Sequence, residues 1–419
     1  MADAMSTVSS RRPTQSDRDR TRFATGAGRY FADLPHGDAL HAVFLRAPLA
    51  HAVIQRLDAT AARAMPGVAA ILTGADCAAA GFRNFRAAMR YRGEGDRPLV
   101  VPFRPVLAQD MVRHVGEAVA CVVAATRAQA EDAAEAIVVE YAGRSAVIGL
   151  DAAQDLASPR VHEAAPNNLA IDHRAGDHAA VAQAIREAAH VAEVSVTVPR
   201  LAPVTMEPRG ALARYDARRG AYRLVTPHQG INEIRLDLAA ILDVAAEAIE
   251  IELPDVGGGF GARSPAYPEH AALLLAAKLT GRPVHWVGSR SEMFLTDYHG
   301  RSTRLTGRLA LDADHRFVAL DVTYETDLGA YITPVGAFVN LHNPLQSVSG
   351  TYVIPAIAVR FAQYFTNALP IGPYRGAGRP DMALLVERLV DQAASLSGMD
   401  PLDLRALKDV LAKNGYGPR

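Results

Sequence analysis

The chain has 419 residues, of which 49% are hydrophobic and 21% charged, proportions typical of a globular protein that buries a sizeable core. Its 44 basic side chains are balanced by 45 acidic ones, so the formal net charge at pH 7 is -1. A chain without excess positive charge has no field that would attract nucleic acid or an acidic membrane surface, and we expect neither as a partner.

The cysteine content excludes several kinds of site. Cys77 and Cys121 are too few for a disulfide framework, a four-cysteine zinc site or an iron–sulfur cluster, so any such centre is expected on another chain. The polar N-terminal stretch lacks the apolar segment of a secretory signal, and no apolar run approaches the ~20 residues that span a bilayer. We therefore expect a cytoplasmic protein without a membrane span.

The N-terminal third alternates short apolar stretches with alanine-rich ones, which predicts a compact α+β unit over residues 22–150. Residues 1–21 are polar and aperiodic, and predict a flexible arm. Residues 151–177 are rich in Ala, Pro and Asn, and predict a linker. Within the α+β unit the pattern predicts strands at 40–45, 68–72, 118–124 and 137–141, and helices at 59–64 and 128–136.

The remaining residues, 178–419, are predicted to form a second domain that also mixes strands and helices. No repeat of the kind seen in solenoids or propellers is present. In chain order the pattern predicts a helix at 179–189, strands at 192–198 and 211–215, a helix at 231–242, a strand at 249–253, and helices at 269–280 and 382–397.

A glycine run, Gly-Gly-Gly-Phe-Gly at residues 257–261, follows the strand at 249–253. Successive glycines let backbone N–H groups approach an anion or an oxo ligand, because no Cβ intervenes. No Gly-Lys-Ser/Thr follows, and the spacing is not that of a dinucleotide-binding loop. The alternative is a tight turn between a strand and a helix.

Three further segments carry polar residues that suit a ligand. Gln229, at the end of a strand, can present its amide donor, although such a residue is often a surface or capping residue. Arg375 and Arg379 lie in the glycine-rich loop 372–380, where guanidinium forks suit phosphate or carboxylate; a structural loop with ordinary ion pairs is the alternative. Glu207 is a possible acid or base, or else a cap or the partner of Arg209.

Together these motifs closely resemble the molybdopterin-binding subunits of the xanthine dehydrogenase/aldehyde oxidase family. The resemblance extends over residues 21–411 and implies a fold in which an a/b hammerhead domain precedes the first molybdenum-cofactor-binding domain. The motifs that carry it are Thr226-Pro227-His228-Gln229, Pro254 to Gly261 and Tyr374 to Pro380 in the second region, and Thr25 to Tyr30, Arg46 to Ala52, Met65 to Val68, Pro105 to Ala108 and Val115 to Ala120 in the first.

The resemblance also implies roles for individual residues. Molybdenum would be held by the dithiolene of a pterin, as the cytosine dinucleotide, with no amino-acid ligand. Gln229 matches the family glutamine that donates to the apical oxo group, and Phe260 matches the residue whose backbone N–H approaches the same centre. Arg375 matches the arginine beside the cofactor, where a fixed cation stabilises charge that builds up in the reaction. The other implied cofactor-binding residues are Gly258, Gly259, Gly261 and Gly376.

Family members usually carry one chain of nearly twice this length, and the segment with the general-base glutamate has no counterpart here. The resemblance therefore implies that a second molybdopterin-binding subunit supplies this base, as in the split subunits of nicotinate dehydrogenase. It also implies an iron–sulfur small subunit with [2Fe–2S] clusters and an FAD subunit, which would carry electrons away. Gly376 stands where the carbon monoxide branch has a cysteine, so a copper-linked site is not expected.

Three pocket positions bear on the substrate. Ser264, Asn343 and Ala377 stand where purine-oxidising relatives carry a glutamate, an arginine and a stacking phenylalanine. Loss of these charged and aromatic groups predicts that xanthine is a poor substrate and favours hydroxylation of a pyridine-like ring beside its nitrogen. Oxidation of aldehydes is an alternative. A non-catalytic scaffold is another, against which the intact glutamine, phenylalanine and arginine count.

Overall fold

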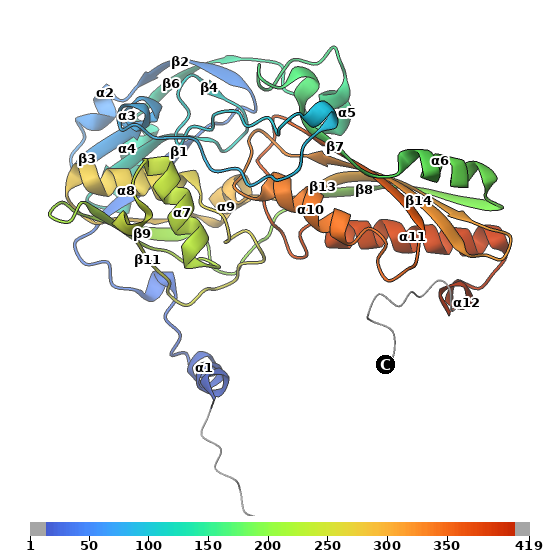
Figure 1. The fold of residues 1–419 in the computed structure, drawn as a ribbon. Coiled ribbons are helices and arrows are strands. Elements are labelled where there is room, and N and C mark those ends of the chain that lie inside the picture. Colours follow the sequence, from blue (N-terminus) through green and yellow to red (C-terminus); the bar gives the residue numbers. More distant parts are fainter. Residues whose placement is uncertain (1–13, 407–419) are drawn as a thin grey trace, which may run out of the picture.

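The computed structural model describes residues 14–406. In this part of the chain the strands form three β-sheets, and most helices pack against them (Figure 1). The sheets have seven, five and three strands. In Figure 1 the five-stranded sheet extends away from the other two, with α6 (His178–Glu187) and α11 (Arg379–Ser397) on its two sides. No helix within these residues is both long and apolar enough to cross a membrane.

The seven-stranded sheet contains segments from both predicted domains. Its order is β11-β10-β9-β12-β1-β5-β3, and β1 pairs in parallel with β12, with Leu40 opposite Val284. The sheet therefore crosses the expected boundary between residues 22–150 and 178–419. In chain order its strands are β1 (Leu40–Arg46), β3 (Val68–Thr73), β5 (Ala118–Ala124), β9 (Gly210–Asp216), β10 (Ala221–Val225), β11 (Ile249–Glu252) and β12 (Val284–Val287).

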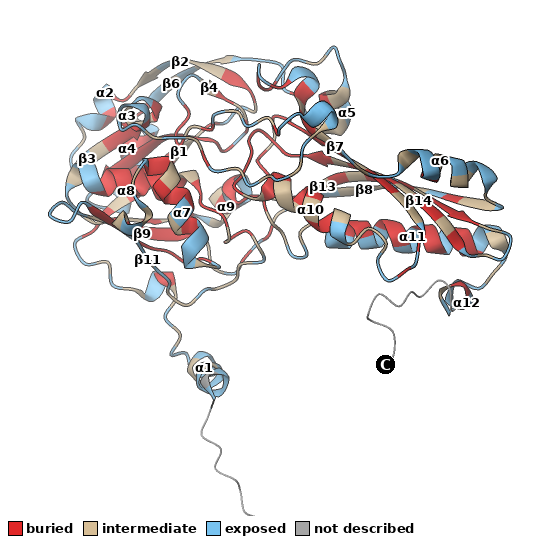
Figure 2. Ribbon diagram, in the orientation of Figure 1, coloured by how far each residue is buried: buried red, intermediate tan, exposed pale blue. Residues whose placement is uncertain are grey.

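Strand β5 is buried along its whole length because helices cover both faces of the sheet there. Successive side chains of a strand point to opposite faces. Cys121 accordingly packs in the core that includes α8 (Pro268–Thr280), whereas Ala120 packs against α4 (Arg127–Glu135). Helix α7 (Ile231–Leu242) belongs to the same core as α8. Figure 2 shows α8 as buried over most of its length.

The five-stranded sheet has the order β7-β15-β14-β13-β8. Helix α11 covers one face, where Leu385 and Leu389 share a core with Leu305. Helix α6 covers the other face, where Val181 packs with Ala310, and its outer side is exposed (Figure 2). The strands are β7 (Leu169–Gly176), β8 (His190–Leu201), β13 (Gly300–Leu311), β14 (Phe317–Asp327) and β15 (Ala356–Tyr364).

The predicted linker at 151–177 is wrong. Helix α5 (Gly149–Gln154) overlaps its start, and β7 within it pairs with β15 as the edge strand of the five-stranded sheet. The Pro and Asn residues instead form a short turn, Pro166–Asn168, in which Asn167 has a left-handed backbone with φ of 56°. Asparagine tolerates this conformation better than most residues. The composition therefore marks one turn and not a connection between domains.

The predicted arm also differs from expectation. Residues 1–13 lie outside the described part, but α1 (Gln15–Ala24) is helical. A capping box explains this start, since the Thr14 hydroxyl accepts from the Asp17 N–H and the Asp17 carboxylate accepts from the Thr14 N–H. The other elements are β2 (Ala52–Asp58), β4 (Met111–Val112) and β6 (Val138–Gly143), which form the three-stranded sheet, and α2 (Thr60–Arg63), α3 (Gly74–Ala79), α9 (Arg290–Thr296), α10 (Gly336–Gln346) and α12 (Pro401–Ala406).

Candidate active site

Three predicted motifs converge at one edge of the seven-stranded sheet. Strands β10 and β11 are parallel neighbours, with Val225 opposite Glu252, so the segments that follow them leave the sheet at the same edge. One segment carries Gln229 and the other the glycine run. The loop 372–378, here named the arginine loop, lies against the glycine run, because a Cβ on Gly261 would be 2.7 Å from the carbonyl oxygen of Pro373.

Hydrogen bonds fix the orientation of Gln229. Its backbone N–H donates to the carbonyl oxygen of Arg263 over 2.9 Å, and its side-chain Oε1 accepts from the N–H of Gly261 over 2.7 Å. A Cβ on Gly259 would lie 2.5 Å from the Cδ of Gln229, so a glycine is required there. Because the amide oxygen is already bonded to the glycine run, the exposed amide NH₂ remains available as a donor to a ligand.

The glycine run has an unusual, partly exposed backbone. Gly258 and Gly261 have φ angles of 114° and 96°, values that residues with a Cβ rarely adopt. Phe260 has φ of 50°, an uncommon conformation for a residue with a Cβ, and its side chain is 44% exposed. Strained residues of this kind cluster at functional sites. The run is therefore more than an ordinary turn between β11 and the next helix.

The arginine loop presents an unpaired cation. Arg375 is exposed, and among residues 14–406 neither it nor Arg379 forms an ion pair, unlike the ordinary structural loop considered as the alternative. The carbonyl oxygen of Arg375 accepts from Nη2 of Arg301 over 2.8 Å. Gly376 has φ of 88°, and a Cβ there would clash with the ring of Pro380 at 2.4 Å. The backbone is thus held while the Arg375 guanidinium stays free.

The three predicted pocket residues have different surroundings. Asn343, in α10, is 8% exposed, and its Nδ2 donates to the carbonyl oxygen of Ala377 over 3.0 Å. The structure thus brings these two together, but the Asn343 amide supports the arginine loop, contrary to the expectation that it faces a substrate. Ala377 has a left-handed φ of 47°. Ser264 is half-buried, and its N–H donates to the carbonyl oxygen of Gly261.

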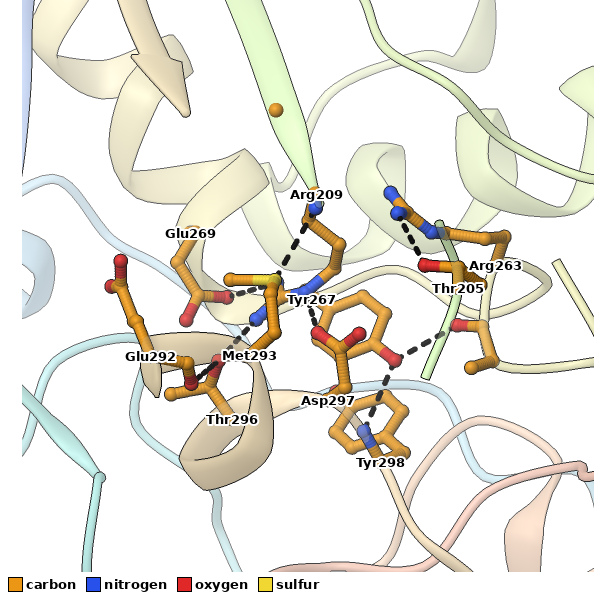
Figure 3. A network of polar contacts seen from close by, with 12 residues as sticks. Thr205, Arg209, Arg263, Tyr267, Glu269, Glu292, Met293, Thr296, Asp297 and Tyr298 are labelled. Carbon is orange, nitrogen blue, oxygen red and sulfur yellow. Dashed lines mark hydrogen bonds and ion pairs between the residues drawn. The ribbon is translucent and has the colours of Figure 1, made fainter. Parts of the chain in front are cut away.

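The interpretation of Glu207 as a partner of Arg209 is wrong. Arg209 is 1% exposed and lies between two other carboxylates, Glu269 and Asp297, as Figure 3 shows. Its guanidinium also donates to the Thr296 hydroxyl. Burial alone would lower the pKa of Arg209, but the nearby carboxylates outweigh it and raise the pKa. Arg209 therefore belongs to a buried ion network behind the site.

That network continues toward the sheet. Arg46 of β1 lies 2.7 Å from the second oxygen of Glu269 and also pairs with Glu292 of α9. Burial raises the pKa of Glu269, and the stronger attraction of Arg209 and Arg46 lowers it well below its usual range. Each buried charge in this group thus has an opposite charge, as low-dielectric surroundings require.

Sequence reasoning missed three residues that hold the loops. Arg301 pairs with Asp381 of α11 at 3.2 Å, and its side chain reaches the arginine loop. Arg263 is 2% exposed, and its Nη2 donates to the Thr205 hydroxyl. The signal for Asp381 was its place in the first turn of a helix, where carboxylates are favoured. Arg301 and Arg263 had no such signal, because their partners are distant in the sequence.

His228 precedes Gln229 and is buried, with 3% exposure. Burial lowers the pKa of His228 to about 4. This effect is larger than that of the carbonyl oxygens of Gly230 and Pro265, which raise the pKa. A neutral imidazole at this position supports the turn that carries Gln229. It is not exposed to a ligand.

The donor set of the site fits an anionic cofactor that bears oxo groups. The exposed Gln229 and Arg375 side chains offer an amide NH₂ and a guanidinium, a donor and a cation, beside the partly exposed glycine run. A Cβ at Gly259 would clash with Gln229 and one at Gly261 with Pro373, so glycine is required at both positions. Within residues 14–406 no three His, Cys, Asp or Glu side chains lie close enough together to hold a metal ion themselves.

Comparison with known proteins agrees with this geometry. Residues 161–408 match the molybdopterin cofactor-binding domain, and residues 25–145 match the a/b hammerhead domain of aldehyde oxidase and xanthine dehydrogenase. The chain is 33% identical over 391 residues to the nicotine 6-hydroxylase large subunit of Paenarthrobacter nicotinovorans. That match covers 92% of this chain and 46% of the relative, so the chain spans about half the length of that protein.

Two further comparisons differ in the share of the relative that is covered. The nicotinate dehydrogenase large molybdopterin subunit of Eubacterium barkeri is 28% identical over 390 residues, which are 93% of this chain and 87% of that subunit. The structure of quinoline 2-oxidoreductase from Pseudomonas putida 86 superposes with a TM-score of 0.87 and 35% identity, over 96% of this chain and 50% of that one. The predicted fold, a hammerhead domain followed by the first molybdenum-cofactor-binding domain, is thereby confirmed, and the chain belongs to the xanthine dehydrogenase/aldehyde oxidase family of molybdopterin-binding large subunits.

Proposed function

We propose that this chain is the large molybdopterin-binding subunit of a multi-subunit hydroxylase that inserts oxygen from water at an electron-poor carbon of an N-heteroaromatic ring. The observation that carries the proposal is the bond from the Gly261 N–H to Oε1 of Gln229, which leaves the Gln229 NH₂ free beside a partly exposed glycine run. When bound, the molybdenum cofactor supplies oxygen transfer and accepts two electrons from the substrate.

The chain's own residues bind and orient in this scheme. The Gln229 NH₂ would donate to an oxo group of the cofactor, and the N–H of Phe260 would lie in the same region. The loops of the site pack closely against each other because a Cβ would meet neighbouring atoms of the protein at four glycines, Gly258, Gly259, Gly261 and Gly376. The Arg375 guanidinium supplies a fixed positive charge, which stabilises negative charge that develops during the reaction.

Other components come from partner chains in this proposal. The cofactor is the cytosine dinucleotide form, and a second molybdopterin-binding subunit supplies the general-base glutamate. An iron–sulfur subunit and an FAD subunit carry electrons away, because two buried cysteines in this chain cannot ligate a cluster. The 87% coverage of the nicotinate dehydrogenase subunit supports a divided arrangement.

The substrate is a pyridine-like ring, hydroxylated beside its nitrogen. Relatives named for nicotine, nicotinate and quinoline support this class. With the Asn343 amide bonded to Ala377, the side chains that this chain offers to a substrate are uncharged and small, namely Ser264 and Ala377. Gly376 replaces the cysteine of the carbon monoxide branch, although carbon monoxide dehydrogenases are also relatives. Aldehyde oxidation is the second candidate, supported by a TM-score of 0.82 to an aldehyde oxidoreductase from Desulfovibrio gigas.

Native purification tests the assembly. Mass spectrometry of the chains that co-purify, with molybdenum and pterin analysis, is expected to find a second molybdopterin-binding chain and a metal-loaded complex. The single chain loaded with cofactor is expected to be inactive. Turnover by that single chain would contradict the division of the site.

Steady-state assays of the complete complex test the chemistry. We expect nicotinate-like pyridines to exceed aromatic aldehydes and xanthine in kcat/KM; xanthine as the best of the three would refute the substrate class, and an aldehyde preference would favour the second candidate. Gln229→Ala and Arg375→Ala are expected to lower turnover at least about tenfold, which corresponds to ~1.4 kcal/mol. Gln183→Ala and Arg186→Ala on the exposed side of α6 are the matched controls.

A further inference from the structure

Glu207 occupies a specific place beside the glycine run that none of the proposed roles uses. Its Oε2 accepts from the N–H of Gly257 over 2.8 Å, and its Oε1 accepts from the N–H of Phe31 over 3.1 Å. One carboxylate therefore joins two backbone segments that are 226 residues apart in the sequence. Hydrogen bonds to a charged acceptor are stronger than those between neutral groups.

The backbone of Glu207 adds to this connection. Its N–H donates to the carbonyl oxygen of Gly257 over 3.0 Å, and a Cβ on Gly257 would lie 2.5 Å from the Cβ of Glu207. Its own carbonyl oxygen accepts from the Thr205 hydroxyl and from Nη2 of the buried Arg263. The close approach explains why the run begins with glycine at 257.

The other end of the connection is rigid. Phe31 is 3% exposed and packs in a small core with Leu212 and Val225, and its ring stacks on His285 at 5.3 Å between centroids. Asp255, just before the glycine run, makes a parallel connection, since it accepts from the N–H of Arg29 over 2.6 Å and pairs with Arg22 of α1. The N-terminal segment thus contacts the run at two neighbouring points.

We propose that Glu207 is a positioning residue that holds the glycine run against the buried Phe31 and thereby sets the place of the run relative to Gln229. The N–H of Gly261, at the far end of the run, donates to Gln229, so a shift of the run would change this hydrogen bond. The relevance to a cofactor rests on the proposed function, whereas the mechanical link from Phe31 through Glu207 to the run does not.

Two variants test the link. Glu207→Ala removes both acceptors. Glu207→Gln keeps the size of the side chain but leaves one oxygen, and its NH₂ faces a second donor, so an intermediate effect is expected. Glu193→Gln on the exposed surface of β8 is the matched control.

Hydrogen exchange of the full chain, resolved to single amides, measures the effect without any cofactor. In Glu207→Ala we expect exchange at Gly257, Phe31 and Gly261 to rise at least tenfold, with amides of β13 and β14 unchanged. In Glu207→Gln a smaller rise at the same three amides is expected. Unchanged exchange at Gly261 in both variants overturns the positioning role, and so does an equal rise at all amides, which indicates general destabilisation.

Molybdenum content and the Mo(V) electron paramagnetic resonance signal of the purified complex provide the second readout. We expect Glu207→Ala to lose at least threefold in molybdenum per chain, with a changed signal in the fraction that remains loaded. Normal loading with an unchanged signal overturns the role. If the wild-type complex contains no molybdenum, the proposed function fails, but the exchange result at Gly261 still decides whether Glu207 positions the run.

Discussion

The side-chain amide of Asn343 donates to the carbonyl oxygen of Ala377 over 3.0 Å, and this bond joins α10 to the loop that carries Arg375. Ala377 has a left-handed backbone, and its N–H donates to the carbonyl oxygen of Tyr374. The conformation of the arginine loop therefore depends on a donor that lies 34 residues away in the sequence.

Replacement of Asn343 tests this dependence. Asn343→Ala leaves the Ala377 carbonyl oxygen without its donor, and Asn343→Asp places a second acceptor against it. We expect Asn343→Ala to lower the free energy of unfolding by about 1 kcal/mol and Asn343→Asp by more, as measured by urea denaturation. Turnover of the complex should fall in the same order. If both variants were as stable as the wild type, the bond would contribute little.

Gly259→Ala and Gly230→Ala form a matched pair in the same region. The new methyl group at 259 would lie 2.5 Å from Cδ of Gln229, whereas at 230 it would meet no atom within 4 Å, on an extended backbone. We expect Gly259→Ala to displace Gln229 and lower turnover at least about tenfold, with Gly230→Ala close to wild type. The kinetics of both complexes decide the matter, and loss in both variants equally would contradict the steric reason.

Removal of one charge from the buried network should destabilise the fold. Glu269→Gln leaves Arg209 and Arg46 without the carboxylate that they share, and we expect a loss of about 3 to 5 kcal/mol in the free energy of unfolding. Glu131→Gln, which breaks an exposed pair with Arg127 on α4, should cost at most about 0.5 kcal/mol. Chemical denaturation of both variants measures the contrast.

The same carboxylate predicts a response to acid. The pKa of Glu269 is lower in the folded chain than its unfolded value of about 4.3, so its contribution is present above that pH and is lost as pH falls further. The wild type should therefore lose stability below about pH 4 more steeply than Glu269→Gln. Parallel curves for the two proteins would contradict this assignment.

His228 predicts a second pH dependence of stability, in a range closer to neutral pH. Its folded pKa of about 4 lies below the unfolded value of about 6.5, so between these values the unfolded chain binds the extra proton. Stability should fall as pH decreases from 6.5 toward 4, by up to about 1.4 kcal/mol per pH unit for this group. His228→Asn should flatten the slope of stability against pH in this window, and an unchanged slope would show that other groups cause it.

The two cysteines should be inert in the folded chain. Both are buried, and burial raises the pKa of Cys77 to about 12 and that of Cys121 further. A thiol without thiolate character and without access reacts slowly. We expect no labelling by a thiol reagent at pH 8 in the native protein and two labels per chain in denaturant. Rapid labelling of the native protein would indicate local opening of β5 or α3.

Local patterns in the sequence predicted most of the helices and strands. The helix expected at 231–242 forms over the same residues, and those at 269–280 and 382–397 form with small shifts at their starts. These elements have long apolar faces, which determine their type without reference to the rest of the chain. The family motifs implied that Gln229, the glycine run and Arg375 lie beside one cofactor, and in the structure Gln229 and the loop that carries Arg375 both contact the glycine run.

Features that depend on distant partners were not predictable. Strand β7 has an ordinary burial pattern, but only its pairing with β15 distinguishes it from a linker. The sequence suggested Glu207 as a partner for Arg209 two residues later, but the chain bends at residues 206–207, and the two side chains reach Gly257 and Glu269 instead. Asn343 was assigned to a pocket by spacing alone, which carries no information on where an amide points.

The parallel pairing of β1 with β12 has a consequence for synthesis. Leu40 is made 244 residues before its partner Val284, which at about 5 to 20 residues per second is an interval of about 12 to 50 s. Strand β5 covers one edge of β1 early in this interval, but the other edge stays open on the ribosome until β12 emerges. Open strand edges pair readily with other chains. Chaperones that shield nascent chains are therefore expected to affect the yield of this protein more than that of proteins whose sheets form from consecutive strands.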